Sequence, residues 1–227
     1  MSARSFDLSQ TPVRELNAAL HEELDGEFKV LEPGGRHAIA VGANGEAKVE
    51  IDGHVGYYCG GMNQRAAIRV RGNCGVGVAE NMMSGRVVIE GDASQAAGAT
   101  AHGGLLAIEG NASARCGISL KGADIVVRGS VGHMSAFMAQ SGRLLVCGDA
   151  GEALGDSIYE ARIYVRGEVT SLGADCVEKD LRDEHRQEVA ELLAAAGIDD
   201  VEAGEFRRYG SARQLYNFDV DDAAVAF

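Results

Sequence analysis

The sequence predicts an all-β solenoid: a right-handed parallel β-helix of about seven coils, with helical extensions at both ends. Glycine recurs at a constant interval of 19 residues, and branched apolar residues stand two and four positions before each of these glycines. The chain of 227 residues also holds 31 glycines but only two prolines. This composition suits a sheet in which nearly every backbone N–H is used.

The recurring glycine defines position zero of each coil. It stands at Gly53, Gly72, Gly91, Gly110, Gly129, Gly148 and Gly167. Position −2 holds Ile51, Val70, Ile89, Ile108, Val127, Val146 and Val165. Position −4 holds Val49, Ile68, Val87, Leu106, Ile125, Leu144 and Ile163. This alternation is typical of a short strand with one buried face.

A short strand with one apolar face cannot bury that face alone. Coils stacked about 4.8 Å apart place like residues above one another and fill a cylinder with Val, Ile and Leu. Positions +3 and +7 hold small residues, which suit tight corners. A coil of 19 residues is too short for a strand and a full helix, so we expect about three short strands in each coil.

The chain divides into three segments. Residues 1–46 are expected to hold an N-terminal helix and a degenerate first coil around Gly34. Residues 47–176 form the predicted β-helix, and residues 177–227 form an acidic helix, ended by Gly197, and a C-terminal tail. Because solenoids need covered ends, we expect the two helices to be caps.

Charge and composition exclude several classes of protein. With 21 basic and 34 acidic residues the net charge is −13, which argues against nucleic acid and against anionic membrane surfaces as partners. No apolar run is long enough for a membrane span, and the N-terminus does not resemble a signal peptide. We therefore expect a cytoplasmic protein whose five cysteines are reduced.

Residues with catalytic potential do not gather at one phase of the repeat. Cys59 and Cys116 share a phase but stand three coils apart, about 14 Å, and the six histidines are scattered. Charged residues beside the repeated glycine are expected to form a solvated outer face. We therefore predict no catalytic, cofactor-binding or metal-ligating residues on this chain.

One outward position breaks the polar pattern. Position −3 is charged in the first coils, at Glu50 and Arg69, and then apolar in five consecutive coils. The apolar residues are Val88, Ala107, Val126, Leu145 and Tyr164, called the outer row below. A row of this length is unfavourable in water. Either a terminal segment of the chain covers it, or it is an interface with a partner protein.

The G-x-x-G-x-x-x-G units, as in 53–60 and 148–155, resemble the GXGXG domain of glutamate synthases, a right-handed β-helix. The closer resemblance is to its free-standing form, the GXGXG subunit of N-methylglutamate synthase and related complexes. Matching stretches include GYYCGGMN at 56–63, GVAENMMSG at 77–85 and GHMSAFMAQSG at 132–142. The resemblance covers nearly the whole chain, including FDLSQTPVRELNAALH and RRYGSARQLYNF near its ends.

This resemblance implies a non-catalytic structural subunit of a heteromeric enzyme. It would bridge a class-II glutamine amidotransferase-like subunit and a flavin-dependent glutamate synthase-like subunit, which would carry FMN and an iron–sulfur cluster. The implied reaction converts glutamate and methylamine to N-methylglutamate and ammonia. Two alternatives are the equivalent subunit of a synthase that uses glutamine or ammonia, and a protein like the chain of formylmethanofuran dehydrogenase that has the same repeat.

Overall fold

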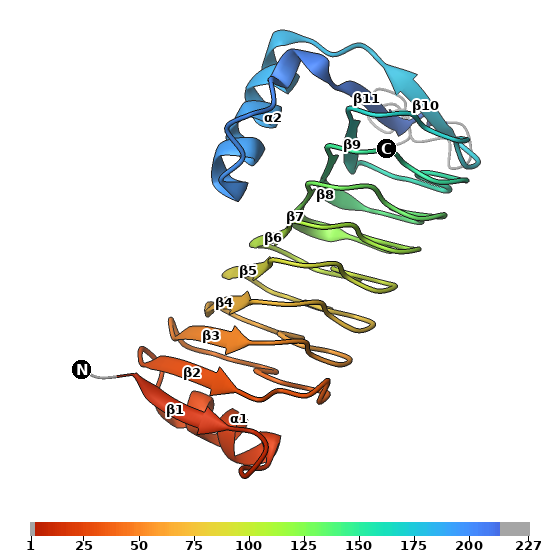
Figure 1. Cartoon of the computed structure of the whole chain (residues 1–227). Helices are drawn as coiled ribbons and strands as arrows, with labels where there is room; N and C mark the ends of the chain where they lie inside the picture. Colours follow the sequence, from red (N-terminus) through yellow and green to blue (C-terminus); the bar gives the residue numbers. More distant parts are fainter. Residues whose placement is uncertain (1–2, 214–227) are drawn as a thin grey trace, which may run out of the picture.

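The computed structural model describes residues 3–213 and shows one elongated stack of coils (Figure 1). The elements in chain order are β1 (Arg4–Asp7), α1 (Val13–Glu22), β2 (Glu27–Leu31), β3 (Lys48–Asp52), β4 (Ala67–Val70), β5 (Arg86–Ile89), β6 (Leu105–Ile108), β7 (Lys121–Val127), β8 (Ser141–Val146), β9 (Arg162–Val165), β10 (Cys176–Lys179), α2 (Asp183–Ala196), the 3₁₀ turn η1 (Ala203–Glu205) and β11 (Arg207–Ser211). The predicted tail residues 214–227 lie outside the described residues.

The strands form a single sheet in the order β1 to β9, followed by β11 and β10. Every pair from β1 to β9 is parallel, so each coil adds one strand to the stack. Val87, Leu106, Ile125 and Leu144 are register partners in consecutive strands and are at most 1% exposed. The predicted parallel β-helix and its interior ladder are confirmed.

The expectation of three strands per coil is wrong. Each coil contributes one regular strand and a single bridging residue at position +2, as in the pair Val55–Cys74. The remaining corner is built from turns in which alternate residues have left-handed φ, such as Tyr58 (59°) and Met62 (54°). Their N–H groups still bond to the next coil, from Tyr58 to the carbonyl of Val76 and from Met62 to that of Glu80.

Two positions of the repeat need small residues for different reasons. At position zero the backbones of neighbouring coils meet closely: a Cβ on Gly72 would lie 2.7 Å from the carbonyl carbon of Gly53. At position +7, in a turn, a side chain would point into the apolar interior. Gly98 has a φ of +66° there, and a Cβ would lie 2.5 Å from Cδ1 of Ile125. The glycine spacing thus reflects the stacking distance of the coils as well as turn geometry.

Position +1 carries a ladder of polar side chains along the edge of the stack. Each side chain accepts a hydrogen bond from the backbone N–H at +1 in the following coil, at 2.7–2.9 Å. The acceptors are His54, Asn73, Asp92, Asn111, Ser130 and Asp149. This position is therefore more than a solvated face, because it satisfies backbone donors at the corner where the strand ladder stops.

The N-terminal end of the stack is closed as expected, by α1 (Figure 1). Leu16 and Leu20 are buried against the first coil. The side chain of Asn17 makes hydrogen bonds of the kind that the backbone of a preceding coil would make. Its Nδ2 donates to the carbonyl of Ala38 at 2.8 Å, and its Oδ1 accepts from the N–H of Ala40 at 2.9 Å. Strand β1, which the sequence did not predict, extends the sheet beside β2.

The C-terminal end differs from the expectation. The last parallel strand, β9, pairs with β11, and β11 pairs with β10, both in antiparallel register. Helix α2 does not close the end of the solenoid, because its apolar side packs against the outer face of the sheet. Neither helix in the described range 3–213 has the length and apolar character of a membrane span.

The interior ladder makes a prediction about stability. Ile108 is 2% exposed and pairs with Ile89 and Val127. Ile108→Asp should abolish cooperative folding, because an unpaired carboxylate in this ladder costs several kcal/mol, about 3 or more. Circular dichroism during thermal unfolding measures whether the transition is cooperative and where its midpoint lies. The control Ala67→Asp places the same charge on an exposed, outward position of β4. A folded Ile108→Asp chain with an unchanged midpoint would contradict the ladder.

Candidate partner-binding surface

The outer row is buried within the chain. Val88, Ala107, Val126, Leu145 and Tyr164 do line up along β5 to β9, as their common phase predicted, but they are between 0 and 5% exposed. They form one cluster with apolar residues of the C-terminal segment. Those residues are Val189, Leu192, Leu193, Ala196, Ile198 and Phe206. Of the two alternatives for this row, the structure shows the first, in which a terminal segment covers it.

Polar contacts hold this segment in place around the apolar contact. The hydroxyl of Tyr164 donates to Glu188 of α2, and Arg162 pairs with the same carboxylate group at 2.8 Å. Burial, followed by the hydrogen bond to Glu188, raises the pKa of Tyr164 well above its usual value. Arg128 pairs with Asp200 at 2.7 Å, and Arg166 pairs with Glu205 at 2.7 Å.

The hypothesis that the outer row is a partner interface is therefore wrong for this fold. The apolar surface of the row meets the apolar stripe of α2, and neither side remains open to another protein. No local pattern in the sequence indicates the register between a helix and a sheet that lie far apart in the chain. Any partner surface must lie on another part of the molecule.

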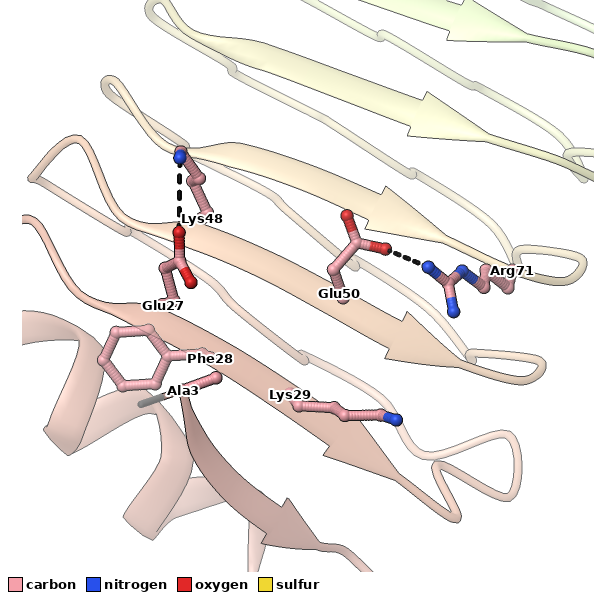
Figure 2. A pocket seen from close by; sticks show the side chains of 7 residues that line it. All are labelled: Ala3, Glu27, Phe28, Lys29, Lys48, Glu50 and Arg71. Atoms are coloured by element: carbon pink, nitrogen blue, oxygen red, sulfur yellow. Dashed lines mark hydrogen bonds and ion pairs between the residues drawn. The ribbon is translucent and has the colours of Figure 1, made fainter. Parts of the chain in front are cut away.

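The same sheet face is uncovered over β2 to β5 and forms a shallow charged groove. Two neighbouring cavities, of about 410 Å³ and about 210 Å³, share Lys48 and Glu50 in their linings. Figure 2 shows the larger cavity, with Lys48 near Glu27 at one side and Glu50 directed toward Arg71 at the other. The change at position −3 from Arg69 to Val88 marks the border between this groove and the covered row.

The charges in the groove pair with one another. Lys48 lies 3.3 Å from Glu27, Arg71 lies 3.0 Å from Glu50, and Lys29 lies 3.3 Å from Asp52. All of these side chains are at least a quarter exposed, so each pair contributes little to folding. The groove offers both signs of charge on a flat sheet, an arrangement that suits a polar contact.

A second uncovered surface lies on the turn side of the first coils. Four large apolar side chains there are about half exposed: Tyr57, Tyr58, Met62 and Met83. The first three belong to one coil, and the N–H of Met83 donates to Asn63 of that coil, so the four lie on neighbouring turns. We call these four residues the turn patch. Met82, the neighbour of Met83 in the sequence, is instead buried in the core.

The five cysteines are free thiols, and all of them are buried. Burial raises the pKa of Cys59 and of Cys116 to about 12, and that of Cys147 to about 11. Thiols in this condition behave as small apolar side chains. Within residues 3–213 no three His, Cys, Asp or Glu residues are grouped as metal ligands would be.

The chain is 61% identical to Protein GlxC of Rhizobium meliloti (strain 1021). The similarity extends over 222 residues, which are 96% of this chain and 97% of that protein. The chain belongs to the GlxC family. No protein-family profile matches the sequence. The family relationship supports the resemblance to glutamate synthase-like proteins as a group.

For this member of the GlxC family, the buried outer row predicts the effect of a single charge. Val126→Lys should destabilise the isolated chain by about 3–5 kcal/mol, because Val126 is 1% exposed and its side chain lies in an apolar cluster. This loss should lower the unfolding midpoint by about 10 °C. Met83→Lys, on the turn patch, is the matched control. An unchanged midpoint for Val126→Lys would mean that α2 does not cover the row in solution.

Thiol reactivity gives an independent check on the core. At pH 8 a thiol with a pKa of about 12 is ionised in roughly one molecule in ten thousand. We expect the native chain to react slowly with Ellman's reagent, and the chain in guanidinium chloride to release five equivalents. Rapid labelling of one thiol in the native chain would contradict the burial described here.

Proposed function

We propose that the chain is a structural subunit of a glutamate synthase-like heteromeric complex and serves as the scaffold on which the catalytic subunits assemble. The observation that carries this proposal is the full-length relationship to GlxC combined with the unbroken 19-residue step of the coils. A stack without insertions has no long loops, which are the segments that usually carry catalytic residues. It does provide a long, rigid surface with fixed spacing.

The two uncovered surfaces suit different kinds of contact. The turn patch presents large apolar side chains of the types that are enriched in binding hot spots or at adaptable interfaces. The groove on β2 to β5 presents paired charges, which contribute more to specificity than to affinity. We propose that the turn patch provides most of the binding energy for one partner.

At a finer level we propose that the complex is an N-methylglutamate synthase. The partners would be a class-II glutamine amidotransferase-like subunit and a flavin-dependent synthase subunit that carries FMN and an iron–sulfur cluster. The reaction would convert glutamate and methylamine to N-methylglutamate and ammonia. What supports this level is the resemblance of stretches such as GHMSAFMAQSG at 132–142 to the free-standing GXGXG subunit.

The experiment is co-expression of the chain with an amidotransferase-like subunit and a flavin-dependent synthase subunit from the same organism. Size-exclusion chromatography measures assembly, and the purified complex is then assayed with glutamate and methylamine, and separately with glutamine and 2-oxoglutarate. Turnover in the first assay alone supports the N-methylglutamate synthase. Turnover in the second alone supports the alternative glutamate synthase. Failure of all chains to associate would contradict the scaffold itself.

The turn patch makes this test specific. Met62→Asp should leave the isolated chain folded, because Met62 is 52% exposed and aspartate tolerates its left-handed φ of 54°. It should weaken assembly by about 2 kcal/mol, the loss typical of a hot-spot residue. Gln64→Asp, an exposed neighbour in the same coil, is the matched control. Equal assembly of Met62→Asp and the parent chain would place the interface on another surface.

A further inference from the structure

We propose that a cavity at the C-terminal end of the sheet binds a small oxyanion, the phosphate or carboxylate group of a metabolite. The cavity has a volume of about 320 Å³ and lies against β9, β10 and β11. Its basic lining residues are Arg162, Lys179, Arg208 and Arg213, whereas Glu160 is its acidic one. Positive charge is concentrated here in a chain whose net charge is −13.

The topology of the sheet forces two of these cations together. Strand β11 is inserted between β9 and β10, and its Arg208 lies directly opposite Lys179 in the antiparallel register. Like charges in directly opposed cross-strand positions destabilise a sheet. Burial and the charges of Arg208 and Arg213 lower the pKa of Lys179. The fold therefore holds a repulsive pair that an anion would neutralise.

The nearby carboxylates compensate for only part of this charge. Arg162 pairs with Glu188 at 2.8 Å, and Arg213 lies 3.5 Å from Glu160. Arg208 donates a long contact of 3.5 Å to the carbonyl of Asp180. Within residues 3–213 no ion pair of 4.0 Å or less joins Arg208 or Lys179 to a carboxylate, although the charges of Glu160 and Asp175 partly offset the lowering of the Lys179 pKa. Two basic side chains of the lining are thus left for a ligand.

Two donors of the lining are also unsatisfied. The Nε atoms of Arg162 and Arg208 are buried and have no hydrogen-bond partner among the described residues. Buried donors in folded proteins are almost always paired, so two unpaired donors beside one cavity are consistent with a bound ion or an ordered water there. An oxyanion accepts several hydrogen bonds at once, and the planar guanidinium group matches its geometry. The volume falls at the small end of the range for metabolite sites.

The test is thermal unfolding of the isolated full chain at constant ionic strength, with sodium chloride replaced stepwise by sodium phosphate or by sodium glutarate. Binding to the folded state raises the midpoint with anion concentration. A rise with phosphate alone indicates a phosphate group, a rise with glutarate alone indicates a carboxylate, and either result supports the site. No rise with either anion overturns the proposal.

Two variants separate a site from general screening. Lys179→Gln should weaken anion binding about tenfold, the loss of one charge-assisted hydrogen bond, and should raise the midpoint without anion because the repulsion with Arg208 is removed. Lys121→Gln, an exposed lysine at the start of β7, should bind like the parent. Equal weakening in both variants, or none in Lys179→Gln, would overturn the proposal even if the parent is stabilised. These outcomes do not depend on whether the chain assembles with partners.

Discussion

The constant register between coils is the constraint on which the other features depend. Because the coils from β3 to β9 repeat every 19 residues, Val87, Leu106, Ile125 and Leu144 lie above one another and form one buried ladder. The same register brings Gly72 so close to Gly53 that a side chain would collide with the backbone. It also aligns the polar residues at +1, so that each can accept the N–H of the next coil. A residue inserted into one of these coils must be absorbed in a turn or a bulge, as at the register shift between Lys121 and Asp124, or it would shift all three ladders.

This uniformity leaves little freedom inside the stack, so the chain varies its chemistry on the outside and at the ends. Position −3 is charged over the first coils, where the sheet face is open, and apolar where α2 covers it. The helix thereby divides one face of the sheet into two parts, the exposed groove with paired charges and the buried outer row. At the C-terminal end, the antiparallel insertion of β11 breaks the repeat and brings Arg208 beside Lys179. For a proposed scaffold, these irregular places are where binding of partners or ligands is expected.

Burial of α2 also changes how partner binding is to be understood. An apolar row on a sheet is a common sign of an interface, but here the apolar residues that cover it belong to a later segment of the same chain. The turn patch, Tyr57, Tyr58, Met62 and Met83, remains exposed and lies on turns whose backbone is fixed by hydrogen bonds between coils. A rigid edge of this kind loses little conformational entropy when a partner binds.

The sequence by itself determined the solenoid, because a period in glycine and branched apolar residues translates directly into stacked coils. It also identified both helices and the alignment of the outer row. It did not determine what covers that row, because the contact between Leu145 and α2 has no local signature in the sequence. Nor did it reveal the +1 ladder or the pairing of Lys179 with Arg208, since the roles of Asn, Asp and Lys depend on which backbone or charge lies opposite. Local periodicity fixes the coils, whereas contacts between segments far apart in the chain are decided only when the whole stack has formed.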